Sequence, residues 1–115
     1  MSNPEIANSI KTGNFNTNYH DLGQGEPIIF IHGSGPGVSA YANWRGTMPV
    51  LAEKFRVIAP DMVGFGYTDR PEGITYNMDT WVQQTIDLMD ALGIEKTNLV
   101  GNSFGGALAL ALTIK

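Results

Sequence analysis

The sequence is organised around the pentapeptide Gly101-Asn102-Ser103-Phe104-Gly105, which has the pattern G-x-S-x-G. An apolar run ending at Val100 precedes it, and an alanine- and leucine-rich run follows it. This context predicts a strand, a sharp turn and a helix, which hold a serine hydroxyl clear of the sheet at a helix N-terminus. The flanking glycines are needed because strand and helix pass so close at such a turn that side chains would clash. Ser103 is therefore a candidate nucleophile.

A second glycine-rich stretch lies upstream. It reads His32-Gly33-Ser34-Gly35-Pro36-Gly37 and follows the apolar run 27–31, which predicts a buried strand that ends in a loop. Such a loop supplies one of the two backbone N–H groups that hold an oxyanion during acyl transfer, and the residue after the nucleophile supplies the other. The expected donors are the amides of Ser34 or Gly35 and of Phe104. The alternative is a tight turn without a catalytic part, which the G-x-S-x-G pattern downstream disfavours.

Taken together, these stretches resemble the α/β-hydrolases. They are most similar to the meta-cleavage-product hydrolases, which split carbon–carbon bonds in ring-fission products of aromatic degradation. The stretches that carry the resemblance are Thr17 to Asp21, HGSGPGVSAYANWR from His32 to Arg45, RVIAPDMVGFGYTDRP from Arg56 to Pro71, and MDALGIEKTNLVGNSFGG from Met89 to Gly106. They cover nearly the whole chain, and the HGSGPG loop with the pair Asn43-Trp44 narrows the match beyond a generic hydrolase.

The resemblance implies a role for each matching residue. Ser103 would be the catalytic serine, and the amides of Ser34 and Phe104 would hold the oxyanion. The residues implied to bind substrate are Gly33, Gly35, Asn43 and Asn102, the two asparagines at its 2-oxo/enol and carboxylate end. Two alternatives stay open: Asn43 is equally suited to cap a helix N-terminus, and Asn102 to stabilise the turn.

The sequence lacks the acid and the base that a serine hydrolase needs after its nucleophile. The chain order in this fold is serine, acid, histidine, but residues 104–115 contain no Asp, Glu or His. The resemblance implies a structural role for His32, and His20 is more simply explained as a packing residue than as a displaced base. We therefore interpret residues 1–115 as a single truncated core domain, the N-terminal half of an α/β-hydrolase, without the cap domain and without the acid and histidine region.

These residues are compatible with three functions. The first is hydrolysis of a 2-hydroxy-6-oxo-dienoate with Ser103, incomplete in this chain alone. The second is a non-catalytic, self-associating α/β module derived from such a hydrolase, and the third is an esterase or peptidase of the same fold. Dehalogenases and epoxide hydrolases of this fold carry aspartate at the elbow, so the serine argues against both.

Composition excludes several other classes. The net charge is −4 and no basic cluster is present, which argues against a nucleic-acid partner. There is no cysteine, no H-E-x-x-H and no nucleotide-binding glycine pattern, so we expect neither a metal nor a cofactor. A secretory signal and an apolar run long enough to span a membrane are also missing, which favours a cytoplasmic protein that acts on a small molecule and has no membrane partner.

Apolar spacing predicts alternating strands and helices. Two short strands joined at Gly13-Asn14 come first, and a helix over Met78 to Leu92 is bounded by Asn77 and Gly93. The remaining predicted elements are strands at 28–31, 56–60 and 97–101, and a helix that contains Trp44, Met48 and Leu51 and ends near Lys54. This order predicts a parallel sheet with helices on both faces.

The strand at 97–101 has no later strand to pair with in this sequence. An unpaired strand edge beside an apolar helix invites association. We therefore expect the chain either to form a homo-oligomer through this edge or to pair with a complementary C-terminal chain.

Overall fold

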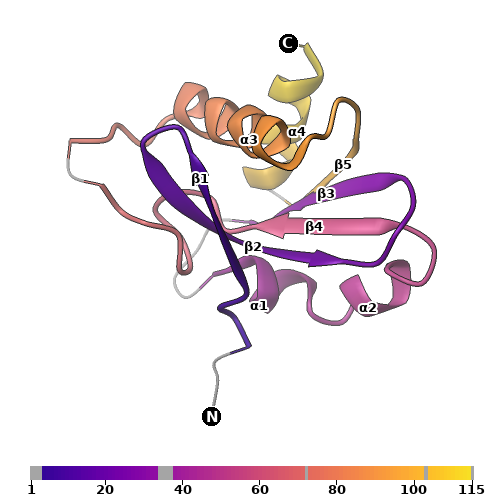
Figure 1. The fold of residues 1–115 in the computed structure, drawn as a ribbon. Helices are drawn as coiled ribbons and strands as arrows, with labels where there is room; N and C mark the ends of the chain where they lie inside the picture. Colours follow the sequence, from indigo (N-terminus) through magenta and orange to yellow (C-terminus); the bar gives the residue numbers. More distant parts are fainter. Residues whose placement is uncertain (1–3, 34–37, 72, 103, 115) are drawn as a thin grey trace.

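A computed structural model of the chain describes residues 4–33, 38–71, 73–102 and 104–114 (Figure 1). The elements in these residues are, in chain order, β1 (Asn8–Thr12), β2 (Phe15–Leu22), β3 (Pro27–Ile31), α1 (Ala40–Trp44), α2 (Met48–Leu51), β4 (Arg56–Pro60), α3 (Met78–Leu92), β5 (Asn98–Gly101) and α4 (Phe104–Ile114).

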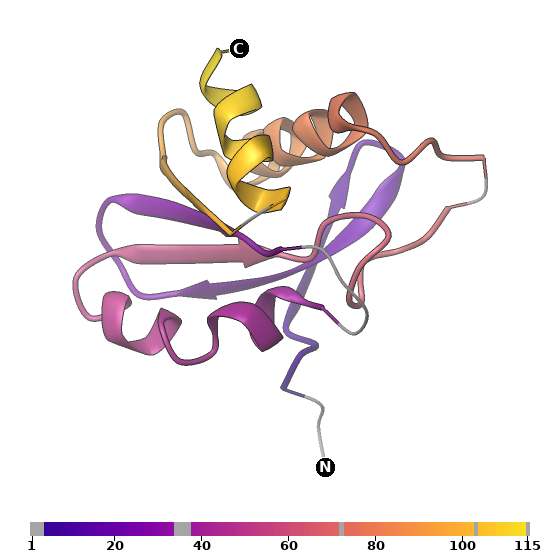
Figure 2. The same ribbon diagram turned by 180° about the vertical axis from the view of Figure 1, so that it is seen from behind.

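The strands form one mixed sheet in the order β1-β2-β4-β3-β5. β3 runs parallel to both β4 and β5, whereas β2 is antiparallel to β1 and to β4. Helices α1 and α2 lie on one face of the sheet, and α3 and α4 lie on the other (Figures 1 and 2). The predicted α/β class, with helices on both faces of a mostly parallel sheet, is confirmed, as is the hairpin that turns at Gly13-Asn14.

Strands β3 and β4 form the centre of the core because their side chains are buried on both faces. On the face of α3 and α4, Ile29 and Ile58 pack in one cluster that includes Leu88. On the face of α1 and α2, Phe30 and Val57 belong to a second cluster. Continuous apolar runs such as 28–31 are typical of strands covered on both sides.

The predicted helix through Trp44, Met48 and Leu51 is wrong, because the chain forms two short helices there instead of one. Pro49 stands in the first turn of α2, the place where its missing N–H and fixed φ are tolerated. The interpretation of Asn43 as a helix N-cap is also wrong. Ser39 caps α1, and its Oγ accepts the N–H of Ala42 at 3.1 Å.

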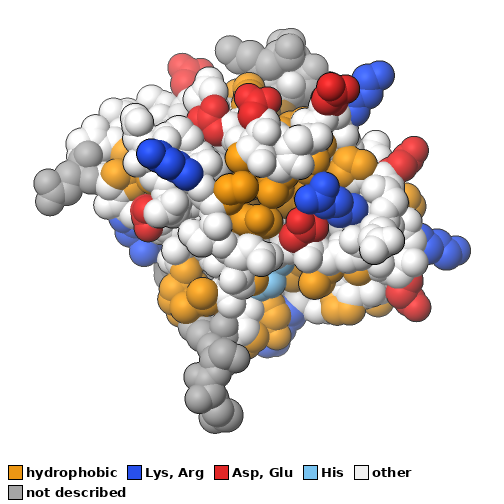
Figure 3. All heavy atoms as spheres, viewed as in Figure 1, with side chains coloured by type: hydrophobic (Ala, Val, Ile, Leu, Met, Phe, Trp, Pro, Cys, Tyr) orange, Lys and Arg blue, Asp and Glu red, His pale blue; other side chains and the backbone are white. Residues whose placement is uncertain are grey.

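Helix α3 begins and ends where the sequence predicts. Asn77 Oδ1 accepts the N–H of Thr80 at 2.9 Å, and Gly93 closes the helix with φ of 72°, a left-handed conformation that favours glycine. Trp81 packs against the cluster that contains Ile29 and Leu88 and donates its Nε1–H to Val63 O at 2.9 Å. Acidic side chains lie over α3 on the outer face in Figure 3, where the helix carries Asp79, Asp87 and Asp90.

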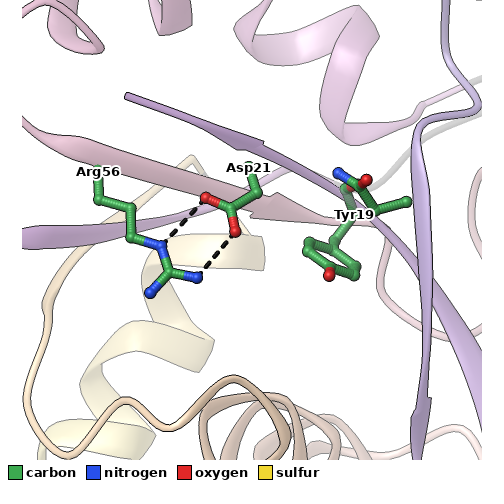
Figure 4. Close-up of polar contacts among 4 residues, drawn as sticks. Tyr19, Asp21 and Arg56 are labelled. Carbon is green, nitrogen blue, oxygen red and sulfur yellow. Dashed lines mark hydrogen bonds and ion pairs between the residues drawn. The ribbon is translucent and has the colours of Figure 1, made fainter. Parts of the chain in front are cut away.

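An ion pair joins β2 to β4 where the hairpin meets the rest of the sheet (Figure 4). Arg56 donates Nε–H and Nη2–H to the two carboxylate oxygens of Asp21, at 3.1 and 2.8 Å. Hydrogen bonding to Asp21 raises the pKa of the Arg56 guanidinium. Burial raises the pKa of nearby Tyr19, and the Asp21 carboxylate acts in the same direction. Since both partners of the pair are partly exposed, it stabilises the fold by no more than about 1 kcal/mol.

Strand β5 is an edge strand within the described part of the chain, and α4 covers it on one side only. Val100 is 38% exposed and Leu110 on α4 is 69% exposed. The exposed apolar surface at this edge therefore gives physical grounds for the predicted association.

No helix in the described residues is both long enough and apolar enough to cross a membrane.

We expect the 115-residue chain by itself to self-associate at micromolar concentration, and Leu110→Lys to shift it toward monomer because a charge would be desolvated at the contact. Sedimentation velocity measures the effect. Val50→Lys is the matched control, since Val50 is 64% exposed on α2, on the opposite face of the sheet. A monomeric wild-type chain, or an equal effect of the two variants, would contradict the prediction.

Candidate active site

The turn between β5 and α4 is closed by backbone packing that only glycine allows. A Cβ on Gly101 would collide with the carbonyl of Gly105, and a Cβ on Gly105 would collide with the carbonyl oxygen of Ile31 and lie 2.8 Å from that of His32. The glycines of the G-x-S-x-G pattern thus have the role that the sequence predicts. Ser103 itself lies outside the described residues.

The two glycine-rich segments meet at the carboxyl ends of β3 and β5. Asn102 donates its N–H to Ile31 O at 3.1 Å, which continues the pairing of the two strands by one residue. A Cβ on Gly33 would lie 3.2 Å from Asn102 O, so the two loops are in contact. Carboxyl ends of parallel strands are where α/β sheets bind ligands. Of the predicted oxyanion donors, Phe104 is the first residue of α4, whereas Ser34 lies outside the described residues, as does the predicted substrate contact Gly35.

Asn43 joins α1 to both of these loops. Its Oδ1 accepts the N–H of Gly33 at 2.6 Å and also the Nδ2–H of Asn102 at 3.4 Å. Because the oxygen is engaged by two donors, the NH₂ group is the end of the Asn43 amide that can donate to a ligand. The N–H of Gly33 already has a partner in Asn43, so any substrate contact of Gly33 would use its other atoms.

His32 is a buried structural residue. Its Nε2 accepts the N–H of Met62 at 3.0 Å, and since a backbone N–H can only donate, the ring proton is on Nδ1, which donates to Gly33 O at 2.7 Å. The side chain is 0% exposed. Burial lowers the pKa of the His32 imidazole, although the bond to Gly33 and the charge of Asp61 act in the opposite direction. His32 therefore holds the glycine-rich loop against the segment after β4.

His20 has the packing role that the sequence favours. Its ring stacks on Tyr41 with centroids 5.6 Å apart, and its Nε2 bonds to Pro4 O at 3.0 Å. The side chain is buried, and its Nδ1 has no partner among the described residues. Among the described residues, neither ring nitrogen of His20 bonds to an acidic side chain that could orient it as a base.

One buried acid at this edge of the sheet, Asp61, is not among the site residues predicted from the sequence. Asp61 follows β4 directly and is 0% exposed, and its carboxylate accepts the N–H of Ala40 at the start of α1. An acidic residue at the end of an apolar run, followed by Gly64 and Gly66, is the signal that could have indicated it. No group of three or more His, Cys, Asp or Glu side chains that could hold a metal occurs in the described residues.

Comparison with known proteins places this geometry in context. Residues 26–115 match the family model of the alpha/beta hydrolase fold. The chain is 54% identical over 113 residues to a 2-hydroxy-6-oxo-2,4-heptadienoate hydrolase of Pseudomonas putida F1, covering 98% of this chain and 41% of that protein. It is 56% identical to a 2-hydroxymuconate semialdehyde hydrolase of Pseudomonas sp. CF600, covering 100% of this chain and 41% of that protein.

A solved structure agrees with these matches. The chain superposes on the meta-cleavage product hydrolase from Pseudomonas fluorescens IP01 with a TM-score of 0.96 and 62% identity, over 97% of this chain and 41% of that one. The chain thus spans about two fifths of the length of the relatives that it matches.

Gly105→Ala is expected to lower the free energy of unfolding by about 2 to 3 kcal/mol, because the added methyl meets the immobile backbone of β3. Gly106→Ala on the same helix is the control. Its Cβ would lie 3.8 Å from Gly101 O and meet no nearer atom in the described part of the chain, so its effect should stay within about 1 kcal/mol. Urea unfolding compares the two, and equal losses would show that the close approach is not what requires glycine.

The free energy of unfolding should depend on the protonation of His32. Because folding lowers the pKa of this imidazole, the unfolded chain binds the proton more readily. The contribution of His32 to stability is therefore complete above its unfolded pKa of about 6.5 and is lost as the pH falls toward the pKa of the folded state.

Urea unfolding between pH 8 and pH 5 tests this dependence, with His32→Gln to remove the titrating group and His20→Gln as the control. We expect the free energy of unfolding to vary less with pH in His32→Gln than in the wild type, and to vary as in the wild type in His20→Gln. The same slope in wild type and His32→Gln would refute the assignment. An NMR titration of the imidazole signals gives a second readout if the variant is too unstable.

Proposed function

The chain belongs to the α/β-hydrolase fold family, and from this premise we propose that the protein hydrolyses a carbon–carbon bond in a 2-hydroxy-6-oxo-dienoate, with Ser103 as the catalytic serine. The named relatives at 54–56% identity act on substrates of this class, as their names state. Because the chain covers 41% of each, the activity is carried over as a proposal for the protein.

The observation that best supports this proposal is the convergence of Gly33, Asn43 and Asn102 at the carboxyl ends of β3 and β5. Three segments far apart in sequence bring amide groups together at Asn102, the residue that precedes Ser103 in the sequence. A substrate with a carboxylate and a 2-oxo or enol oxygen needs hydrogen-bond donors, and a neutral amide supplies them without requiring a counter-ion. The NH₂ of Asn43 is the donor that the geometry leaves for it.

The proposed reaction begins with ketonisation of the dienol. The 6-oxo carbonyl carbon is then attacked by the Ser103 hydroxyl or by an activated water, and the amides of Ser34 and Phe104 stabilise the resulting oxyanion. Collapse of this intermediate breaks the carbon–carbon bond. The fragment without the 6-oxo carbon leaves as a 2-hydroxy-dienoate. If water attacked, the other fragment is released directly as a carboxylic acid. If Ser103 attacked, that fragment stays bound as an ester of Ser103 until a water hydrolyses it to the acid and restores the hydroxyl, so either route consumes one water. The base that activates the serine and the acid that orients it are not among residues 104–115.

One relative offers a direct parallel. The Pseudomonas fluorescens protein was solved as an S103A mutant complexed with acetates. The number coincides with that of the elbow serine of this chain, and acetate carries the carboxylate group that both proposed products share. This agreement supports Ser103 as the residue to replace in a test.

In the complete natural protein, Ser103→Ala should lower kcat for a 2-hydroxy-6-oxo-dienoate by about 10⁴-fold or more, because removal of the nucleophile leaves only binding and oxyanion stabilisation. Loss of the yellow colour of the substrate measures turnover. Ser9→Ala, on the exposed hairpin strand β1, is the control and should keep full activity.

A panel of simple esters run beside the dienoate distinguishes the other functions. Faster turnover of esters would indicate an esterase of the same fold. Failure of a fluorophosphonate to label Ser103, together with no turnover of either substrate, would contradict catalysis altogether.

A further inference from the structure

Asp61 is a fully buried carboxylate that the proposed chemistry does not use. It lies one residue beyond β4, and its side chain accepts three hydrogen bonds from neutral donors. Oδ1 accepts the N–H of Ala40 at 2.7 Å, and Oδ2 accepts both the Nδ2–H of Asn18 and the N–H of Tyr67, each at 2.9 Å. The donors come from the start of α1, from β2 and from the loop after β4, so one carboxylate ties three segments together.

The bond to Ala40 is important because α1 is only five residues long. Isolated helices shorter than about 12 residues are not stable, so tertiary contacts must fix the position of α1. Ala40 is its first residue, and the adjacent cap Ser39 donates its Oγ–H to Glu5 at 2.7 Å. Two carboxylates, Asp61 just after β4 and Glu5 in the N-terminal segment, therefore anchor the same end of the helix.

Asn43 lies three residues after Ala40 on this helix and makes the contacts to Gly33 and Asn102. A continuous path thus runs from the end of β4 through Asp61 and α1 to the amide that faces the elbow. We propose that Asp61 is a positioning residue, which fixes α1 so that Asn43 holds both loops and presents its NH₂ group to the substrate. The kinetic part of this proposal rests on the function proposed above.

Asp61→Asn can test the hold on α1 separately from the stability of the whole fold. One carboxylate oxygen accepts only the N–H of Ala40 on α1, whereas the other accepts both donors from outside the helix. The introduced amide has the same shape but only one acceptor oxygen. Two of the three hydrogen bonds are kept if this oxygen faces the Nδ2–H of Asn18 and the N–H of Tyr67. Its NH₂ group then opposes the N–H of Ala40, so the bond that holds α1 is the one lost. Thr68→Val is the matched control. It removes a buried hydroxyl that bonds to Asp61 O and to the N–H of Asn18, in the same network but without contact to α1.

The first measurement is the rate of backbone amide hydrogen exchange in the complete natural protein. This measurement needs no substrate, so its result does not depend on the proposed function. We expect faster exchange in residues 38–45 for Asp61→Asn and no such change for Thr68→Val. Ser39→Ala removes the cap of α1 independently and shows the size of the local increase that a loosened α1 gives. Ala40→Pro removes the N–H that Asp61 accepts while leaving Asp61 unchanged, at the first helical position where proline is tolerated, so it keeps the test decisive if Asp61→Asn does not fold. Unchanged exchange in 38–45, or the same increase in Thr68→Val, would overturn the proposal.

The second measurement is a double-mutant cycle on dienoate turnover, with Asp61→Asn and Asn43→Ala combined. Displacement of a positioned group can cost about 100-fold in rate, so Asp61→Asn should lower kcat/KM by up to about that factor in the wild-type background. It should have little further effect when Asn43 is already alanine, because both changes remove the same contact. Additive effects would show that Asp61 does not act through Asn43. If the wild type does not turn over the dienoate, the proposed function fails, and the exchange result still decides whether Asp61 holds α1.

Discussion

The structure depends on one close approach, the crossing of α4 over the ends of β3 and β5. Backbone atoms of Gly101, Gly105 and Ile31 come so near one another that any side chain at either glycine would collide with a carbonyl. This contact sets the direction in which the chain leaves β5 and the place where α4 begins. The position of the elbow relative to the glycine-rich loop follows from it, since Asn102 is bonded to Ile31 at the same point.

Around this crossing, polar side chains lie at the carboxyl edge of the sheet. Their hydrogen bonds join the loops to one another and to the start of α1. His32 joins the glycine-rich loop to the segment after β4, and Asp61 joins that segment to α1. Asn43 closes the arrangement by bonding to Gly33 and Asn102. Each of these side chains satisfies backbone N–H or C=O groups that regular secondary structure leaves unpaired, and His32 and Asp61 do so while fully buried.

The opposite property marks the outer edge of β5 and the surface of α4. There the described chain has exposed apolar side chains, such as Leu110, and no strand next to β5. Leu110 is the most exposed of the large apolar side chains in the described residues, and it lies on the helix that covers β5. Exposed apolar edges favour contact with further protein surface, whether from the same polypeptide or from another copy.

Local residue patterns determined much of this protein. The elbow glycines, the apolar runs of β3 and β4, and the boundaries of α3 at Asn77 and Gly93 could be read from the sequence because each reflects a short-range steric or hydrogen-bonding requirement. The tertiary structure alone decided the order of the strands and the partners of Asn43 and Asp61. Those features depend on contacts between residues 10 to 59 positions apart, such as Gly33 with Asn43 and Asn43 with Asn102, and spacing along the chain carries no signal for such contacts until the sheet brings the segments together.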